Sequence, residues 1–141
     1  MRIVKFTLIA VLALLALNAV AYGLFFVVSP ADGLREFAVS GAVPVTPGTL
    51  HLVSLAGIGF LGFAGFAVLA AALLLQGKGN GAGVAAVLGA TYLAIGLHAI
   101  SIGLRVDALI YGGFGVLTCL FSALLWRLTT RERAHSPSHV E

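Results

Sequence analysis

The stretch LHLVSLAGIGFLGFAGFAVLAAALLL, residues 50–75, contains no aspartate, glutamate, lysine or arginine. About 20 helical residues are enough to cross the roughly 30 Å of hydrocarbon in a bilayer. Because hydrocarbon offers the backbone no hydrogen-bond partner, a segment that crosses it forms a helix. We therefore predict a transmembrane helix here. Three further apolar runs complete a set of four spans, at about 6–28, 50–75, 84–104 and 108–125.

The composition of the whole chain is that of a membrane protein. Of its 141 residues, 60% are hydrophobic and 9% are charged, whereas soluble domains have about 45–50% and about 25%. A soluble fold of this size buries too little surface to hide so much apolar side chain. The high hydrophobic content also excludes a disordered chain, because disordered chains are poor in hydrophobic residues. The single cysteine, Cys119, excludes a disulfide scaffold. We predict an all-α polytopic membrane protein, a four-transmembrane-helix bundle.

The predicted bundle is one domain over residues 1–128, followed by a mobile tail over 129–141. Its longest connection, 29–49, starts with Ser29-Pro30-Ala31-Asp32, where proline fits the first helical turn and the aspartate complements the positive helix end. We predict a short interfacial helix there, which Gly41 ends. Thr46 or Thr49 is expected to cap the second span.

The basic residues predict the orientation in the membrane. With the N-terminus inside, six of the eight lysines and arginines flank the inner ends of the spans and two flank the outer ends. The inner six are Arg2, Lys5, Lys78, Arg127, Arg131 and Arg133, and the outer two are Arg35 and Arg105. Because short loops rich in Lys and Arg stay cytoplasmic, we expect both termini in the cytoplasm. The net charge of +3 then indicates contact with lipid headgroups and not with nucleic acid.

Small residues predict how the helices pack. In the third span Ala82, Gly89, Gly96 and Gly103 recur every seven residues and share one face, which favours close approach of a neighbouring helix. In the second span four glycines alternate with phenylalanines, in the series Gly57, Gly59, Phe60, Gly62, Phe63, Gly65 and Phe66. This series predicts tight helix contacts, or a cleft with a glycine floor and phenylalanine walls for a flat or chain-like lipophilic guest. A homo-oligomer also stays open, since lipid-facing and partner-facing apolar surfaces look alike in sequence.

Polar side chains inside spans are costly, so they are the candidate site residues. His98, Ser101 and Arg105 share a stripe that points toward the outer surface. The candidates for catalysis are His98, Arg105, Asp107, Tyr22 and Tyr111, and those for ligand binding are His51, Ser101, Asn18, Tyr92, Phe60 and Phe63. Structural roles are the alternative: an Arg105–Asp107 pair, Tyr111 at the interface, and His98 bonded to a neighbouring helix.

No metal site is predicted. His51 and His98 lie on neighbouring spans, but counted from the turn near Asn80 they differ by roughly 16 Å in height at about 1.5 Å per residue. That offset is too large for one haem iron or one zinc ion, whose bonds are about 2 Å long. The sequence leaves the identity of any cofactor open.

The order of the segments is similar to that of DoxX-like small four-helix bacterial membrane proteins. The first span ends in Phe25-Phe26-Val27-Val28-Ser29-Pro30, and a short outer helix and three closely connected spans follow. The resemblance implies a bacterial inner-membrane protein, an accessory to a redox or lipid-linked system, and it transfers no site residue.

The polar residues and the apolar clefts lead to three functional hypotheses. The first is a membrane-complex subunit or a binder of a hydrophobic ligand, acting through an outward-facing polar pocket. The second is a membrane enzyme for a quinone, isoprenoid or polyketide, with His98 as acid or base. The third is a small-solute transporter. The expected partners are the lipid bilayer and either a lipophilic small molecule or a partner subunit.

Overall fold

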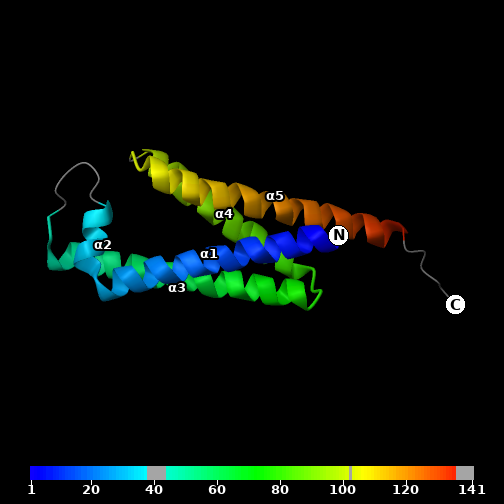
Figure 1. Ribbon diagram of the computed structural model, residues 1–141, viewed down its shortest axis with the longest axis horizontal. Coiled ribbons are helices and arrows are strands. Elements are labelled where there is room, and N and C mark those ends of the chain that lie inside the picture. The colour runs from blue at the N-terminus through cyan, green and yellow to red at the C-terminus, as the bar shows by residue number, and fades with distance from the viewer. Residues whose placement is uncertain (38–43, 102, 136–141) are drawn as a thin grey trace.

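The computed structural model describes residues 1–37, 44–101 and 103–135, almost all of them helical. The elements are α1 (Arg2–Val28), α2 (Pro30–Phe37), α3 (Pro47–Leu75), α4 (Asn80–Ser101) and α5 (Arg105–His135). Figure 1 shows α1 beside α3 in one pair and α4 beside α5 in a second. Four of these helices are long and apolar enough to cross a membrane, and this confirms the predicted all-α bundle of four spans.

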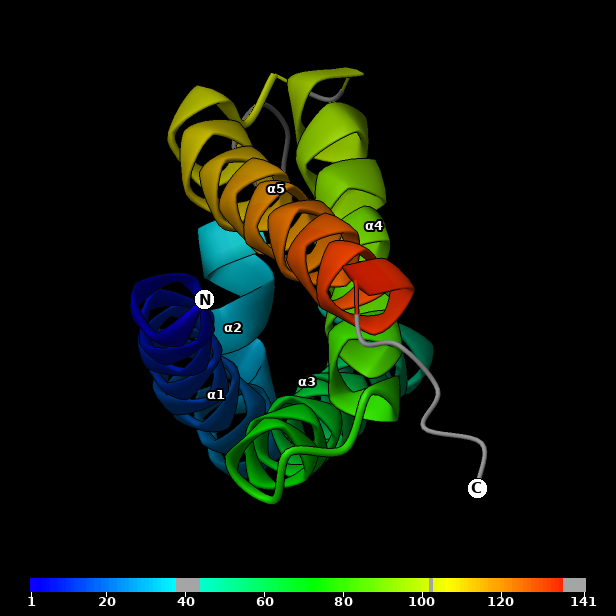
Figure 2. The ribbon, with the colours of Figure 1, turned by 90° about the vertical axis from the view of Figure 1, so that its right-hand side faces the viewer.

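The four long helices alternate in direction and form a ring. In Figure 2, α1, α3, α4 and α5 follow one another around the bundle, and each contacts the next, with α5 closing against α1. The N-terminus, the α3–α4 turn and the last turns of α5 lie at one end, here termed the basic end. The other end, termed the α2 end, holds α2 and the α4–α5 turn (Figure 1). The six basic residues predicted to flank the inner ends of the spans therefore lie toward the basic end, and the other two lie toward the α2 end.

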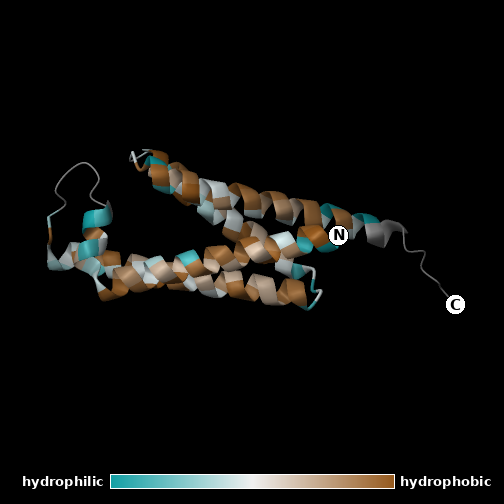
Figure 3. Cartoon of the chain, viewed as in Figure 1, coloured by the Kyte–Doolittle hydropathy of each residue, from teal (hydrophilic) through white to brown (hydrophobic). Residues whose placement is uncertain are grey.

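The outer surface of the bundle is apolar between its two ends. Figure 3 shows hydrophobic residues along all four long helices and hydrophilic ones gathered toward the ends. Large side chains such as Leu17, Val87 and Leu109 point away from the interior and are mostly exposed. Water would oppose this exposure, whereas lipid chains accept it. The chain is thus a multi-pass membrane protein.

Glycines bring the backbones of α4 and α5 into direct contact. A Cβ on Gly96 would lie 2.6 Å from the backbone nitrogen of Gly112, and one on Gly89 would lie 3.0 Å from that of Cys119. The close approach predicted for this face of the third span is confirmed at Gly89 and Gly96. The prediction that Gly103 belongs to this helix face is wrong. Gly103 lies in the α4–α5 turn with a φ of +85°, a conformation that favours glycine.

The pairing of α1 with α3 uses one glycine of the predicted series. A Cβ on Gly57 would lie 2.8 Å from the carbonyl oxygen of Gly23 in α1. At Gly59, Gly62 and Gly65 a Cβ would meet none of the described atoms within 4 Å. These three glycines therefore face outward, and they do not form the floor of a cleft.

The predicted starts of α2 and α3 are confirmed. α2 begins at Pro30 and buries Leu34 against the bundle, so this short helix packs on the ends of α1 and α3. Thr46 caps α3: the backbone N–H of Thr49 donates to its hydroxyl oxygen at 3.1 Å, and the Thr46 N–H donates to the Thr49 hydroxyl at 2.9 Å. The predicted stop at Gly41 lies outside the described residues.

The last helix is longer than predicted. α5 continues to His135, so residues 129–135, which were assigned to the tail, belong to the last helix. No glycine or proline occurs between Gly115 and Pro137 to end the helix. The Thr129 hydroxyl lies within hydrogen-bond distance of the carbonyls of Leu125, at 3.1 Å, and Trp126, at 2.8 Å, so its one proton bonds back to the preceding turn. Residues 136–141 of the predicted tail lie outside the described residues.

Candidate functional site

Six aromatic side chains from all four long helices form one cluster inside the bundle. We term it the aromatic cluster, and its members are Tyr22 and Phe26 of α1, Phe60 and Phe63 of α3, Tyr92 of α4 and Tyr111 of α5. Neighbouring ring centroids lie 5.8–6.4 Å apart, within the range of favourable aromatic pairs. The structure thus brings together five of the predicted site residues and adds Phe26, which sequence reasoning missed as a site residue.

Four buried polar atoms in the interior have no hydrogen-bond partner among the described residues. They are the side-chain oxygens of Asn18, Tyr92, Thr118 and Ser122. A buried polar group without a partner costs about 1–3 kcal/mol, so each is a candidate for contact with a bound molecule or water. Thr118 and Ser122 were not predicted as site residues, although their spacing of four places them on one face of α5.

The predicted outer stripe does not join the aromatic cluster. His98, Ser101 and Arg105 are exposed on the surface toward the α2 end, and the Ser101 hydroxyl donates to the backbone carbonyl of His98 at 2.7 Å. Tyr111, by contrast, is buried in contact with Tyr22, at a centroid distance of 6.4 Å. The placement of these side chains therefore does not support one pocket shared by His98 and the tyrosines.

The remaining predicted residues also lie apart from the interior. His51 is exposed in the first turns of α3, and Asp107 is half-buried in the first turn of α5. Among the described side chains the one ion pair joins Arg35 to Asp32 at 3.3 Å, and the proposed Arg105–Asp107 pair is not formed. The catalytic and ligand-binding roles of these residues stay predictions.

An apolar cleft lies where α3, α4 and α5 meet, and we term it the α3–α4 cleft. It encloses about 480 Å³, within the usual range of about 300–1,000 Å³ for ligand sites. Its walls include Phe63, Phe66, Gly83, Val87, Leu88 and Trp126. Phe63 also contacts Tyr92, at a centroid distance of 5.9 Å, so the cleft reaches the aromatic cluster.

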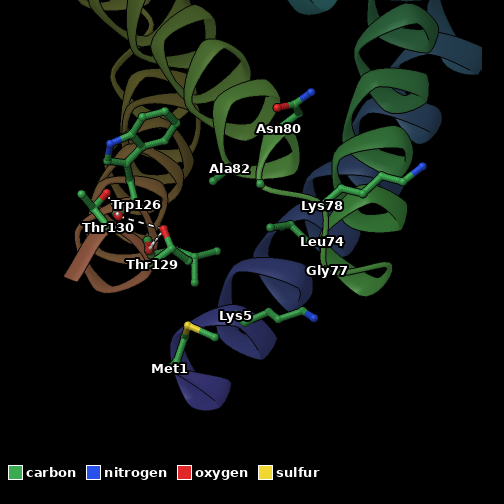
Figure 4. A pocket seen from close by; sticks show the side chains of 12 residues that line it. Met1, Lys5, Leu74, Gly77, Lys78, Asn80, Ala82, Trp126, Thr129 and Thr130 are labelled. Atoms are coloured by element: carbon green, nitrogen blue, oxygen red, sulfur yellow. Dashed lines mark hydrogen bonds between the residues drawn. The ribbon is translucent and has the colours of Figure 1, made fainter. Parts of the chain in front are cut away.

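A smaller and more polar pocket of about 190 Å³ lies at the basic end, and we term it the basic pocket. Figure 4 shows Lys5 and Lys78 on one side of it and Trp126, Thr129 and Thr130 on the other. Each lysine comes from a different segment, α1 or the α3–α4 turn. The pocket is therefore assembled only when both helix pairs are in place.

Comparison with protein-family models, curated proteins and solved structures finds no match to this chain. The resemblance to DoxX-like proteins in the order of the segments stays a prediction. Function is therefore inferred from the side chains that line the two cavities.

Proposed function

We propose that this protein binds a hydrophobic ligand in the α3–α4 cleft. The observation that carries the proposal is the shape and lining of that cleft: two phenylalanines, a tryptophan and aliphatic side chains around about 480 Å³. Phe66 and Trp126 are 57% and 60% exposed, so the cleft opens sideways to the bilayer. A chain-like or flat apolar molecule can enter it from lipid without crossing water.

We further propose that the protein resides in the bacterial inner membrane with the basic end in the cytoplasm. Six of the eight lysines and arginines belong to the segments at that end, and positively charged short loops remain on the cytoplasmic side. A ligand in the α3–α4 cleft would then come from the cytoplasmic leaflet, because Asn80, which lines the cleft, begins α4 at the basic end.

The proposed orientation predicts which single cysteines a membrane-impermeant maleimide reaches in intact cells. In a Cys119→Ala background, Pro44→Cys before α3 should be labelled from outside. Gly79→Cys in the α3–α4 turn should be labelled only after the membrane is permeabilised. Both positions are exposed and lie outside the helices, so differences in burial do not confound the comparison. The reverse pattern would overturn the orientation.

Gly83→Leu should block the cleft. A Cβ on Gly83 meets none of the described atoms within 4 Å, so the leucine side chain can occupy the cleft without displacing a helix. Trp126 is the single tryptophan and lines the cleft, so a phospholipid with brominated acyl chains should quench its fluorescence when a chain binds there. We expect Gly83→Leu to weaken this quenching about tenfold in apparent affinity, as steric conflict of about 1–3 kcal/mol implies.

Gly62→Leu is the matched control for this experiment. A Cβ on Gly62, like one on Gly83, meets none of the described atoms within 4 Å, but Gly62 does not line the cleft. This variant should be quenched like the unmodified protein. If Gly83→Leu and Gly62→Leu behave alike, the α3–α4 cleft is not the binding site and the proposed function is wrong.

A further inference from the structure

The two cavities adjoin each other. Asn80 and Trp126 line both the α3–α4 cleft and the basic pocket, so an apolar space and a more polar one meet at the basic end of the membrane-spanning region. Tryptophan is enriched at this depth, between hydrocarbon and headgroups, because its ring is apolar and its N–H is polar. A molecule that fills both cavities must therefore have an apolar chain and a polar head.

The charge of the basic pocket selects the sign of that head. Lys5 and Lys78 line it, and of the described residues around the pocket none is acidic. The one ion pair among the described side chains, Arg35–Asp32, lies in α2 at the opposite end. The two ammonium groups thus have no carboxylate partner in the described part of the chain, and an anion complements them.

The hydroxyls opposite the lysines add a second feature. Thr130 donates to the backbone carbonyl of Trp126 at 2.9 Å, and Thr129 donates to the same carbonyl at 2.8 Å, as the dashed lines in Figure 4 indicate. Because both protons are already engaged, the two oxygens are left to act as acceptors. This wall suits a head that carries hydroxyl donors beside its negative charge.

We propose that the basic pocket and the α3–α4 cleft together hold one anionic phospholipid with a hydroxylated headgroup. Its phosphate lies against Lys5 and Lys78, its headgroup hydroxyls contact Thr129 and Thr130, and one acyl chain runs past Trp126 toward Phe63. The chain portion rests on the proposed function, and the selection of the head is new. The ligand bridges α1, the α3–α4 turn and α5, and so joins the two helix pairs at the basic end.

The test compares two brominated probes, phosphatidylglycerol and phosphatidylcholine, in nanodiscs of the full chain. Quenching of Trp126 should require less phosphatidylglycerol than phosphatidylcholine. We expect the apparent affinities to differ by at least about tenfold, since each lysine near an anionic lipid contributes about 1 kcal/mol. In the double variant Lys5→Gln/Lys78→Gln this preference should fall to near unity, while quenching by phosphatidylcholine stays the same. The matched control, Arg2→Gln/Arg127→Gln, removes the same charge at the same end from exposed residues that do not line the pocket, and it should keep the preference.

The outcomes of this comparison distinguish failure of the anionic headgroup from failure of the proposed function. Equal quenching by both probes, still abolished by Gly83→Leu, would overturn the anionic headgroup and leave the proposed function standing. If both double variants lose the preference for phosphatidylglycerol, the preference is a general effect of surface charge. That result would overturn the basic pocket as the headgroup site. Displacement of brominated phosphatidylglycerol by soluble glycerol phosphate would show that the pocket holds a free phosphate compound and no lipid. Quenching that is insensitive to Gly83→Leu would overturn both proposals.

Discussion

Gly96→Leu should separate α4 from α5 and lower the free energy of unfolding by about 3 kcal/mol or more. A Cβ at this position would lie 2.6 Å from the backbone nitrogen and 2.7 Å from the Cα of Gly112. The obstacle is backbone, so rotation of a flexible side chain cannot relieve it, and the two helices must move apart. Close packing, which small residues permit, is one of the main sources of attraction between helices in lipid, where no hydrophobic force drives them together. Unfolding in mixed micelles, followed by circular dichroism, measures the loss.

Gly62→Leu serves as the control for this prediction as well. A Cβ on Gly62 meets none of the described atoms within 4 Å, and leucine is the better helix former. Its stability should equal or slightly exceed that of the unmodified protein. A Gly96→Leu variant as stable as Gly62→Leu would contradict the contact between α4 and α5.

Phe60→Ala should cost about 3–5 kcal/mol, the usual range for a buried phenylalanine. The Phe60 ring is 9% exposed, and its centroid lies within 5.8–6.3 Å of those of Phe26, Tyr22, Tyr111 and Phe63. These rings come from α1, α3 and α5, so the side chain connects the two helix pairs. Its removal leaves a cavity and breaks four aromatic contacts at once. The same unfolding measurement detects the loss.

The control for Phe60 is Phe6→Ala. Phe6 has the same side chain but is 60% exposed at the start of α1, so its loss should change stability by less than about 0.5 kcal/mol. Similar losses in the two variants would mean that burial in the aromatic cluster contributes nothing to stability.

The helix bounds show how far local patterns extend. The third span, expected at 84–104, is a helix over Asn80–Ser101. It begins early because backbone hydrogen bonding continues through the polar and glycine residues before the apolar run, and it ends before the turn at Gly103. The last span, expected at 108–125, continues to His135 for the same reason. Hydropathy marks the part of a helix that lipid covers, and it does not mark where the helix ends.

The candidate site was predicted less well than the fold. Tyr92 and His98, six residues apart on α4, were both candidate site residues, yet Tyr92 is fully buried and His98 is exposed. Basic residues near the termini, Lys5 among them, were expected to touch lipid headgroups, but nothing in the sequence placed Lys5 and Thr130 on the same pocket. These residues lie at opposite ends of the chain and meet only through packing of the two helix pairs.

The sequence by itself determined the number of membrane-spanning helices, their alternating direction and the end at which the basic residues gather. These properties depend on consecutive residues, through the length of each apolar run and the need of every backbone group for a partner inside lipid. Only the tertiary structure decided which face of each helix points inward and which cavities result. Side chains that face lipid and side chains that face another helix are equally apolar, so their difference arises only from contacts between distant segments.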